Sequence, residues 1–217
     1  VLATHLLEVI RRNLSRLLTM KAMRRLLDEM VNLTDSTRAE ANRKLLDEMI
    51  PDRVPADLLH HILRLLLAEQ VSVRNLPLII EATAEGRQIH AQPEAICEHV
   101  RQRLGFQLVA NLQRPDGTLP LIQLAPEWED TFSTYQIDGE RGRLDVALPP
   151  ELFNTLTGAE QVNRASEQGI APAIITSTAR RRFLRTVLSA KNITAPVLSF
   201  EEIGIDARPA LVGMVAA

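Results

Sequence analysis

The sequence predicts an α+β protein in which an all-helical part precedes a small α/β unit with a mixed sheet. Up to about residue 113, apolar residues recur at helical spacing between short turns. After the turn "RPDG", short apolar strands alternate with helices, which is typical of α/β units. Hydrophobic residues make up 46% of the 217 residues and aromatics only 3%, so the expected core is aliphatic.

The first helices are amphipathic. A helix is expected over residues 2–18, and further helices at about 21–31 and 36–50 contain "RRLLDEM" and "RKLLDEM". In the first helix the apolar positions fall on one stripe: Leu7, Ile10, Leu14 and Leu17. The repeated residue pattern could mark a duplicated unit, but it favours two independent helices built from the same good helix formers.

A short joint separates two apolar helices. Asp57 is a plausible cap or first-turn acid for a helix over Leu58–Ala68, which ends before the alternating segment "VSVR" at residues 71–74. Asn75 is expected to cap the next helix, with Pro77 in its first turn and Gly86 at its end. A helix beginning at Pro93 follows. Its predicted apolar face is Ile96, Val100, Leu104 and Leu108.

The α/β unit begins with the turn at Arg114–Gly117. Strands are expected at "TLPLIQL", "PAIIT", "PVLSF" and "ALVGMV". One or two helices within "LPPELFNTLTGAEQVNRASEQG" end at Gly169, and "STARRRFLRTVLSA" forms another. The polar, glycine-bearing stretch Ile137–Ala147 is expected to be a loop.

Composition excludes several classes of protein. The net charge of −2 leaves no basic surplus for general nucleic-acid binding. The single cysteine, Cys97, cannot form an internal disulfide and suits a reducing compartment. No apolar run approaches the roughly 20 residues that span a bilayer, and no signal peptide is visible. Because the chain begins without Met inside a helix, we expect it to be a fragment of a longer protein.

No residues form a recognisable catalytic or metal-binding set, and no cofactor is predicted. The adjacent His60 and His61 point in different directions, and Cys97 has no base near it in sequence. The acids around Trp128 are typical of a solvated first helical turn: Glu127, Glu129 and Asp130.

The best candidate for a ligand site is "TSTARRRF", where a strand meets a helix N-terminus. An anion could bind there through Ser177, Thr178 and Arg181. The alternative is that Ser177 or Thr178 caps the helix and the arginines lie on its solvated side. That alternative is favoured, because no glycine lets a phosphate approach the backbone.

Three segments resemble one family. "VLATHLLEVIRRNLSRLL" is similar to the A-T-H-L helix of the large export-gate subunit of bacterial flagella and injectisomes, the FlhA/SctV family. "LLHHILRLLLAEQVSVRNLPLIIEATAE" resembles its L-x-x-I-L-x-x-L-L-x-E-x-V-x-I-R-D signature, with Asn75 where Asp is usual. "PAIITSTARRRFLRTVLSAKNITAPVLSFEEI" resembles its closing stretch.

The resemblance implies part of the cytoplasmic domain of a bacterial inner-membrane protein. The motif residues are closer to flagellar members than to injectisome members. Residues 1–19 would end a preceding subdomain, residues 20–114 would form a helical ring-contact subdomain and residues 115–217 a terminal α/β subdomain. Such domains form rings, commonly of nine, and receive export substrates, their chaperones and other export-apparatus proteins. In flagellar members, the A-T-H-L motif borders an apolar dimple that docks chaperones, which maps onto Val1 and Thr4.

Two functions therefore remain open. The first is a non-enzymatic export-gate module without cofactor, nucleic-acid or membrane contact in this fragment, in which Arg74 and Asn75 face the next ring subunit. Arg74 could instead lie in solvent while Asn75 only caps a helix. The second is a small enzyme or regulator that binds an anion or nucleotide at Thr176–Arg182.

Overall fold

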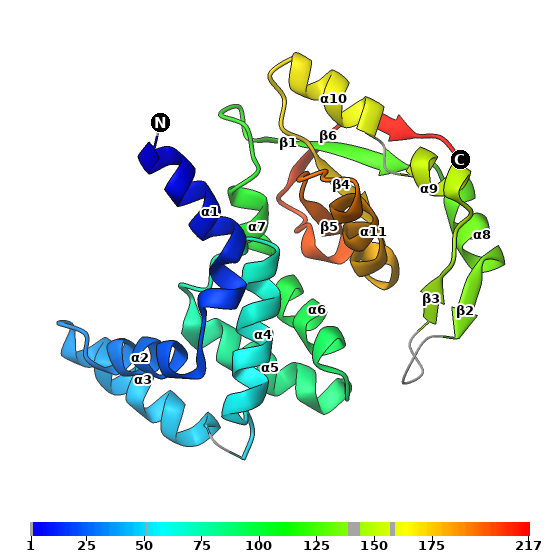
Figure 1. The fold of residues 1–217 in the computed structure, drawn as a ribbon. Coiled ribbons are helices and arrows are strands. Elements are labelled where there is room, and N and C mark those ends of the chain that lie inside the picture. Colours follow the sequence, from blue (N-terminus) through cyan, green and yellow to red (C-terminus); the bar gives the residue numbers. More distant parts are fainter. Residues whose placement is uncertain (1, 51, 139–143, 157–158) are drawn as a thin grey trace. The chain divides into compact units, whose positions relative to one another are not determined.

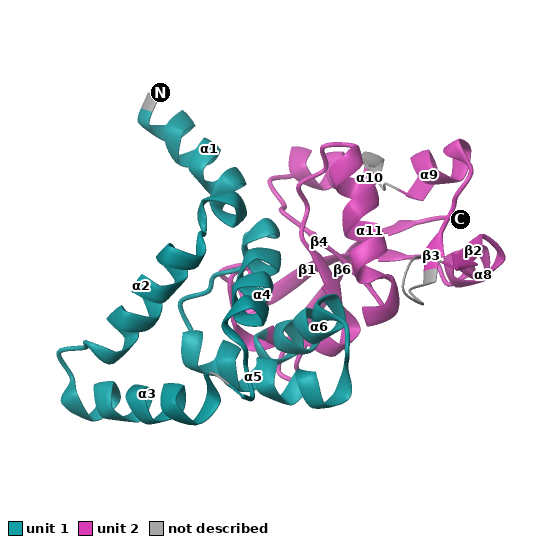
Figure 2. Ribbon diagram, turned by 60° about the horizontal axis from the view of Figure 1, so that its bottom comes forward, with its two compact units in different colours: residues 1–104 teal, residues 105–217 magenta. Residues whose placement is uncertain are grey.

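A computed structural model describes residues 2–50, 52–138, 144–156 and 159–217. By internal contacts the chain divides into two compact units, residues 1–104 and 105–217 (Figure 2). This division falls about ten residues before the Pro-Asp-Gly turn, because the helix that begins at Gly105 packs on the second unit. The functional subdomain limits at residues 20 and 115 stay predictions.

The first unit is all helical, as the apolar spacing predicts (Figure 1). Its helices are α1 (Leu2–Leu17), α2 (Met20–Val31), α3 (Ser36–Met49), α4 (Ala56–Ala68), α5 (Leu76–Ile89) and α6 (Pro93–Arg103). Several aliphatic side chains on α4 and α5 have no exposed surface: Leu59, Ile62, Leu63, Leu66, Ile79 and Ile80. These two helices therefore supply much of the aliphatic core of the unit.

Side chains next to the helix starts supply the missing hydrogen bonds. Thr19 accepts a bond from the Ala22 N–H at 3.1 Å, and the Asp35 carboxylate accepts bonds from the first turn of α3. Asp57 lies in the first turn of α4, where its charge complements the helix dipole. These local signals fix where three helices begin.

The prediction that Gly86 ends a helix is wrong. Helix α5 continues to Ile89, and Gly86 is buried within it. A Cβ atom at this position would lie 3.2 Å from the Ile96 side chain and 3.3 Å from that of His99, both on α6. Gly86 therefore permits the close approach of α6 to α5 instead of terminating the helix.

The single helix expected after Pro93 is interrupted. Helix α6 ends at Arg103, and a short helix, α7 (Gly105–Ala110), follows Leu104. Helix α7 packs against η2 (Phe200–Glu202), a 3-10 turn, so closely that a Cβ on Gly105 would lie 2.2 Å from the Glu202 carbonyl oxygen. This long-range packing breaks the helix at a position that periodicity alone does not mark.

The second unit is built on a four-stranded sheet in the order β5-β4-β1-β6, with every neighbouring pair parallel (Figure 1). The strands are β1 (Thr118–Leu124), β4 (Ala173–Thr176), β5 (Val197–Ser199) and β6 (Arg208–Val215). Strands β1 and β4 are almost fully buried, as their continuous apolar runs predict. The α+β fold class is confirmed.

Antiparallel pairing is present, but in a separate two-stranded sheet. Strand β2 (Gln136–Asp138) pairs with β3 (Leu144–Val146), so parallel and antiparallel pairs do not mix in one sheet. The expectation of a loop over residues 137–147 is wrong where it covers these strands. Its residues 139–143 lie outside the described part of the chain.

Helices α8 (Glu127–Thr134), α9 (Pro150–Leu156), α10 (Ala159–Glu167) and α11 (Thr178–Ala190) complete the unit. Trp128 is 1% exposed, stacks on Phe132 at 5.7 Å between ring centroids, and donates its indole N–H to the Val215 carbonyl. The α11 side chains Leu184 and Leu188 join the same core cluster. Two of the few aromatic residues, Trp128 and Phe132, therefore pack into the core from α8.

We predict that Gly105→Ala lowers the free energy of unfolding by more than about 2 kcal/mol. A Cβ at 2.2 Å from the Glu202 carbonyl oxygen forces one of two backbone segments to move. In a helix, Ala is ordinarily more stabilising than Gly by about 1 kcal/mol. A destabilising effect of Gly105→Ala would therefore point to the contact with Glu202. Urea unfolding followed by circular dichroism measures it.

Gly204→Ala is the control for this prediction. Gly204 is exposed, and no atom lies within 4 Å of the Cβ that alanine would add. Its unfolding midpoint should match that of the wild type. Equal midpoints for all three proteins would show that α7 and η2 do not pack as closely as described.

Candidate functional site

The N-terminal helix is open to contact over most of its length. Every residue from 3 to 12 is exposed, including Thr4. Leu6 and Leu7 are each 57% exposed, although large apolar side chains on helices are usually covered. Val1 lies outside the described residues. Of the two predicted docking residues, the structure therefore places Thr4 on an accessible surface.

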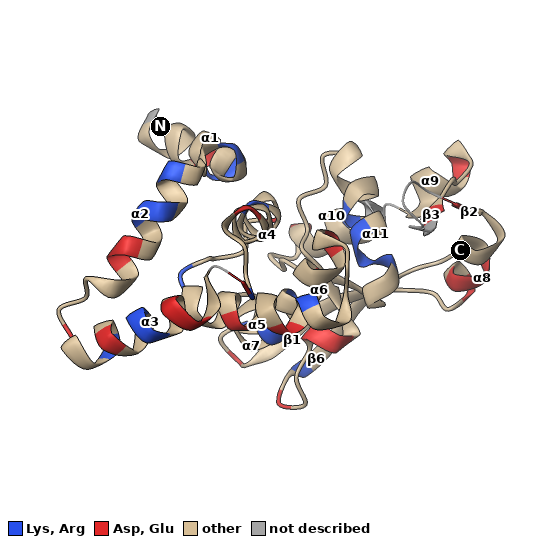
Figure 3. Cartoon of the chain, turned by 90° about the horizontal axis from the view of Figure 1, so that it is seen from below, with Lys and Arg blue, Asp and Glu red and all other residues tan. Residues whose placement is uncertain are grey.

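The same end of the chain is strongly basic. Residues 9–27 contain no acid and carry positive charge on α1 and α2: Arg11, Arg12, Arg16, Lys21, Arg24 and Arg25 (Figure 3). The whole chain has a net charge of −2, so this segment differs in sign from the remainder. Its positive potential attracts partners that present acidic groups.

The joint before α5 holds the predicted interface pair. Arg74 is exposed, and its guanidinium forms no hydrogen bond or ion pair with any residue that the structure describes. Asn75 occupies the N-cap position of α5, as predicted, but its side chain makes no capping bond. Both side chains therefore keep their hydrogen-bonding groups available at a position that the helices α4 and α5 fix.

The candidate anion site lies at the carboxyl end of β4. Ser177 is the N-cap residue of α11, and its side chain makes no capping bond. The Thr178 hydroxyl donates to the Glu201 carboxylate at 2.7 Å. The Glu202 carboxylate accepts a bond from the Ser199 N–H at 2.8 Å and is buried. Two carboxylates thus occupy the edge where an anionic ligand would bind.

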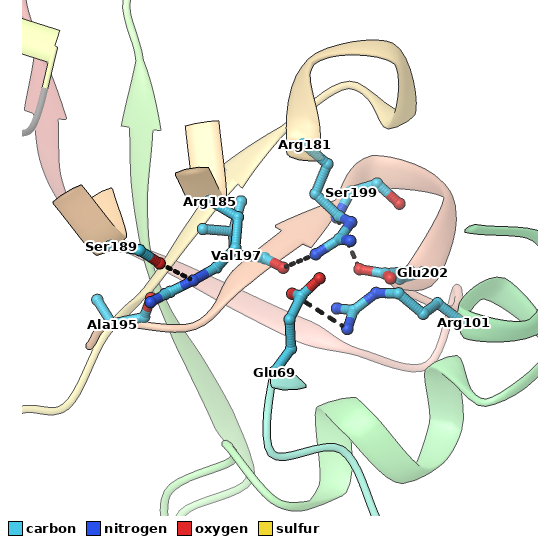
Figure 4. A network of polar contacts seen from close by, with 9 residues as sticks. All are labelled: Glu69, Arg101, Arg181, Arg185, Ser189, Ala195, Val197, Ser199 and Glu202. Atoms are coloured by element: carbon cyan, nitrogen blue, oxygen red, sulfur yellow. Dashed lines mark hydrogen bonds and ion pairs between the residues drawn. The ribbon is translucent and has the colours of Figure 1, made fainter. Parts of the chain in front are cut away.

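Three of the arginines of α11 are engaged within the unit. Arg181 is completely buried, donates to the Val197 carbonyl oxygen at 3.3 Å and points toward Glu202 (Figure 4). Arg185 donates to the carbonyl oxygens of Ala195 and Ile193. The third, Arg180, pairs with Glu129 at 2.7 Å. These contacts stabilise the fold and leave Arg181 out of reach of a soluble anion.

The charge at this edge is negative at neutral pH. Burial raises the pKa of Glu201, but hydrogen bonds, chiefly from Thr178, outweigh burial and hold that pKa below its ordinary value of 4.5. A carboxylate beside the α11 N-terminus takes the place that an anion would occupy. The arrangement therefore speaks against a ligand site. The alternative is also wrong in part, because Ser177 makes no side-chain capping bond and Arg181 is buried instead of lying on a solvated side.

The other chemical candidates remain apart. Among the described residues, no group of three metal-ligating side chains comes together. Cys97 is buried in α6. His60 donates its Nε2–H to the Leu18 carbonyl at 2.7 Å, whereas His61 is exposed. Sequence reasoning missed the His60 contact because 42 residues separate the partners.

The fold is that of cytosolic domains from type III secretion systems. A nonameric SctV-C assembly from EPEC, solved by cryo-electron microscopy, aligns with a TM-score of 0.81 at 20% identity, covering 97% of this chain and 61% of that one. The *Chlamydia pneumoniae* CdsV and CdsO complex aligns with a TM-score of 0.77 at 18% identity, covering 98% and 59%. At these identities the alignments establish the fold alone.

The chain belongs to the FHIPEP family, which it matches over residues 1–208. It is 35% identical over 217 residues to the flagellar biosynthesis protein FlhA of *Caulobacter vibrioides*, covering 99% of this chain and 30% of that protein. It is 28% identical over 214 residues to the hypersensitivity response secretion protein HrcV of *Ralstonia nicotianae*, covering 96% and 30%. The chain thus spans about a third of the length of these relatives.

Within its described residues, no helix has the length and apolarity to cross a membrane.

We predict that Thr178→Val raises the pKa of Glu201 toward 4.5, because it removes the hydroxyl that favours the ionised carboxylate. A lowered folded-state pKa stabilises the protein at neutral pH, and this contribution is lost as the pH falls from about 4.5 through the lower folded value. The acid-side loss should therefore be smaller in the variant. NMR titration and urea unfolding at about pH 7 and about pH 3 measure both effects.

Thr186→Val is the matched control. The Thr186 hydroxyl donates to the Arg182 carbonyl on the same helix and makes no bond to Glu201. This variant should keep the wild-type titration of Glu201. An unchanged Glu201 titration in Thr178→Val would contradict the hydrogen bond as the cause.

Proposed function

We propose that the chain is a non-enzymatic, cytoplasmic part of a bacterial type III protein export gate anchored in the inner membrane. Membership of the FHIPEP family and the fold of secretion-system cytosolic domains support this proposal. The observation that carries it is the pairing of an exposed N-terminal helix with an exposed arginine in a rigid joint. Both features suit contacts with other proteins.

Ring formation is the first part of the proposed function. Arg74 presents a planar guanidinium with no partner in the described chain, which suits a bidentate pair with a carboxylate of a neighbouring subunit. Asn75 adds donor and acceptor groups beside it. The nonameric assemblies of SctV-C and of the EscV cytosolic domain, relatives of the same fold, support a ring of this kind.

Docking of export substrates and their chaperones is the second part. The exposed Thr4 lies in the first turn of α1, where the apolar side chains of Leu6 and Leu7 are also accessible, and the basic residues of α1 begin at Arg11. Val1 precedes it in the sequence. A partner with an apolar patch and acidic groups would fit this surface. The CdsV and CdsO complex supports contact with further export-apparatus proteins.

A flagellar system is the better assignment. The identity to FlhA of Caulobacter vibrioides is 35%, compared with 28% to the hypersensitivity response secretion protein HrcV, at similar coverage of the chain. The competing function, binding of an anion or nucleotide by a small enzyme or regulator, has less support. Its residues Thr178 and Arg181 are already bonded within the fold.

We predict that Arg74→Glu leaves the fold intact and impairs export in the full-length protein. Because Arg74 is exposed and has no partner among the described residues, its reversal should change the free energy of unfolding by about 0.5 kcal/mol or less. Facing a carboxylate of the next subunit, the same change replaces attraction by repulsion. The two measurements are the melting temperature of this chain and the secreted protein in cultures that carry the substitution.

Arg38→Glu is the control for charge reversal alone. Arg38 is also exposed and lies on α3, away from the joint in sequence. Export should be normal in this variant. Normal export by Arg74→Glu as well would show that Arg74 lies in solvent and makes no ring contact. A large drop in melting temperature would show that Arg74 stabilises the fold.

We further predict that the isolated chain is monomeric or associates only weakly. A ring contact centred on a few exposed side chains gives little affinity by itself, and tethering to a membrane raises the effective concentration in the full-length protein. Light scattering over a wide range of protein concentration measures the mass. A tight dimer whose mass does not change on dilution would contradict this prediction.

A further inference from the structure

Within the described residues, the half-buried positions of helix α1 lie near its C-terminal end. Residues 3–12 are exposed, Asn13, Leu14 and Ser15 are half-buried, and Leu18 just beyond the helix is 8% exposed. The contacts that hold it come from α4 (Figure 1). The first turns of α1, which carry Thr4, have no covering element among the described residues of the unit. Their position therefore depends on the direction of the helix.

Two side chains of α4 bind the backbone at this attached end. Arg64 donates its Nε–H to the Ser15 carbonyl at 2.9 Å, and His60 donates its Nε2–H to the Leu18 carbonyl at 2.7 Å. His60 and Arg64 are four residues apart, so they share one face of α4. Their polar heads reach two carbonyls separated by about one helical turn, which constrains the direction of α1 as well as its position.

These carbonyls need outside donors. In a continuous helix the Thr19 N–H would donate to Ser15, but here it donates to the Leu17 carbonyl at 3.0 Å. The Arg64 guanidinium therefore supplies a bond that the helix itself does not make. A positive group at a helix C-terminus also interacts favourably with the helix dipole. Both effects favour the observed contacts over solvation of the two side chains.

A small change of direction at this end moves the other end far. Thr4 precedes Leu18 by about 14 residues, or about 21 Å along the helix. A tilt of about 20° at the attached end would displace Thr4 by about 7 Å. Docking residues need to be held within about 0.5 Å of their productive place, so free tilting of α1 would remove the site.

We propose that His60 and Arg64 are positioning residues that fix the direction of α1 and thereby hold its docking end in place. The expected loss of export rests on the proposed docking role of the Thr4 end. The fixed direction of α1 does not rest on it. His60 and Arg64 do not touch the docked partner. They act through the carbonyl groups of Ser15 and Leu18.

The direction of α1 can be measured by pulsed electron resonance between spin labels at His5→Cys and Glu81→Cys. Both positions are exposed, on α1 and α5 of the same unit. The native Cys97 is 2% exposed and should stay unlabelled, which a count of bound label verifies. His60→Leu with Arg64→Met removes both donors while keeping apolar bulk. The width of the distance distribution should then increase at least twofold.

Two further proteins separate positioning from simple packing. His60→Gln with Arg64→Lys keeps a donor at each place and should restore the narrow distribution. His61→Leu changes the exposed neighbour of His60 and should leave the wild-type width. An unchanged width in the Leu/Met protein, or an equally broad one in the Gln/Lys protein, would overturn the proposal.

Export by cells distinguishes failure of the positioning role from failure of the docking function. The Leu/Met protein should lose most export and the Gln/Lys protein should retain it. Thr4→Asp should reduce export with no change in the distance distribution. Normal export by Thr4→Asp would overturn docking at this end while the spectroscopic result for His60 and Arg64 stood. Normal export by the Leu/Met protein, together with a broad distribution, would overturn the functional part of the inference.

Discussion

Backbone carbonyl groups at helix ends and loops need hydrogen-bond donors, and in this chain cationic side chains supply many of them. Such donors occur in both units and reach across long stretches of sequence. The donor and acceptor pairs are His60 to Leu18, Arg64 to Ser15, Arg87 to Asp52 and Arg53, Arg181 to Val197, Arg185 to Ala195 and Ile193, and Arg208 to Asp116. Each of these side chains therefore supports the backbone, which a positive charge in the sequence does not reveal by itself. An arginine that does not donate to a backbone carbonyl is the better candidate for binding another molecule.

This constraint separates two arginines that composition treats alike. Arg181 follows a strand at a helix start, which is where anions bind in many α/β proteins, yet it is buried and bonded to the Val197 carbonyl. Arg74 lies in a short joint, and neither the charge pattern nor the apolar spacing of the sequence singles it out. Its guanidinium is nevertheless exposed and without a partner in the described chain. Only the burial and bonding of each side chain distinguish a role in the fold from a capacity to bind.

The parts of the fold that could be predicted from sequence are those set by local chemistry. Apolar spacing, the first-turn acid Asp57 and the run "TLPLIQL" place most helices and the first strand. The errors at Gly86, at Gly105 and over β2 and β3 share one cause, which is contact with another element of the fold: α6, η2 and the paired strand, respectively. At the candidate anion site the same cause applies, because Glu201 lies 23 residues from Thr178, the residue that it engages. Periodicity carries no information about such pairs.

The chain offers contacts of two physical kinds. The helical unit presents charge, with Arg74 in its joint and a basic segment on α1 and α2, and contacts made through such groups weaken as salt shortens the Debye length to about 8 Å or less. Apolar side chains are exposed on both units: Leu6 and Leu7 are each 57% exposed on α1, and Phe106 and Phe200 are 65% and 49% exposed on α7 and η2, which pack together. Contacts through these rings would persist at high salt. Ionic strength would therefore weaken the charged contacts and spare the apolar ones.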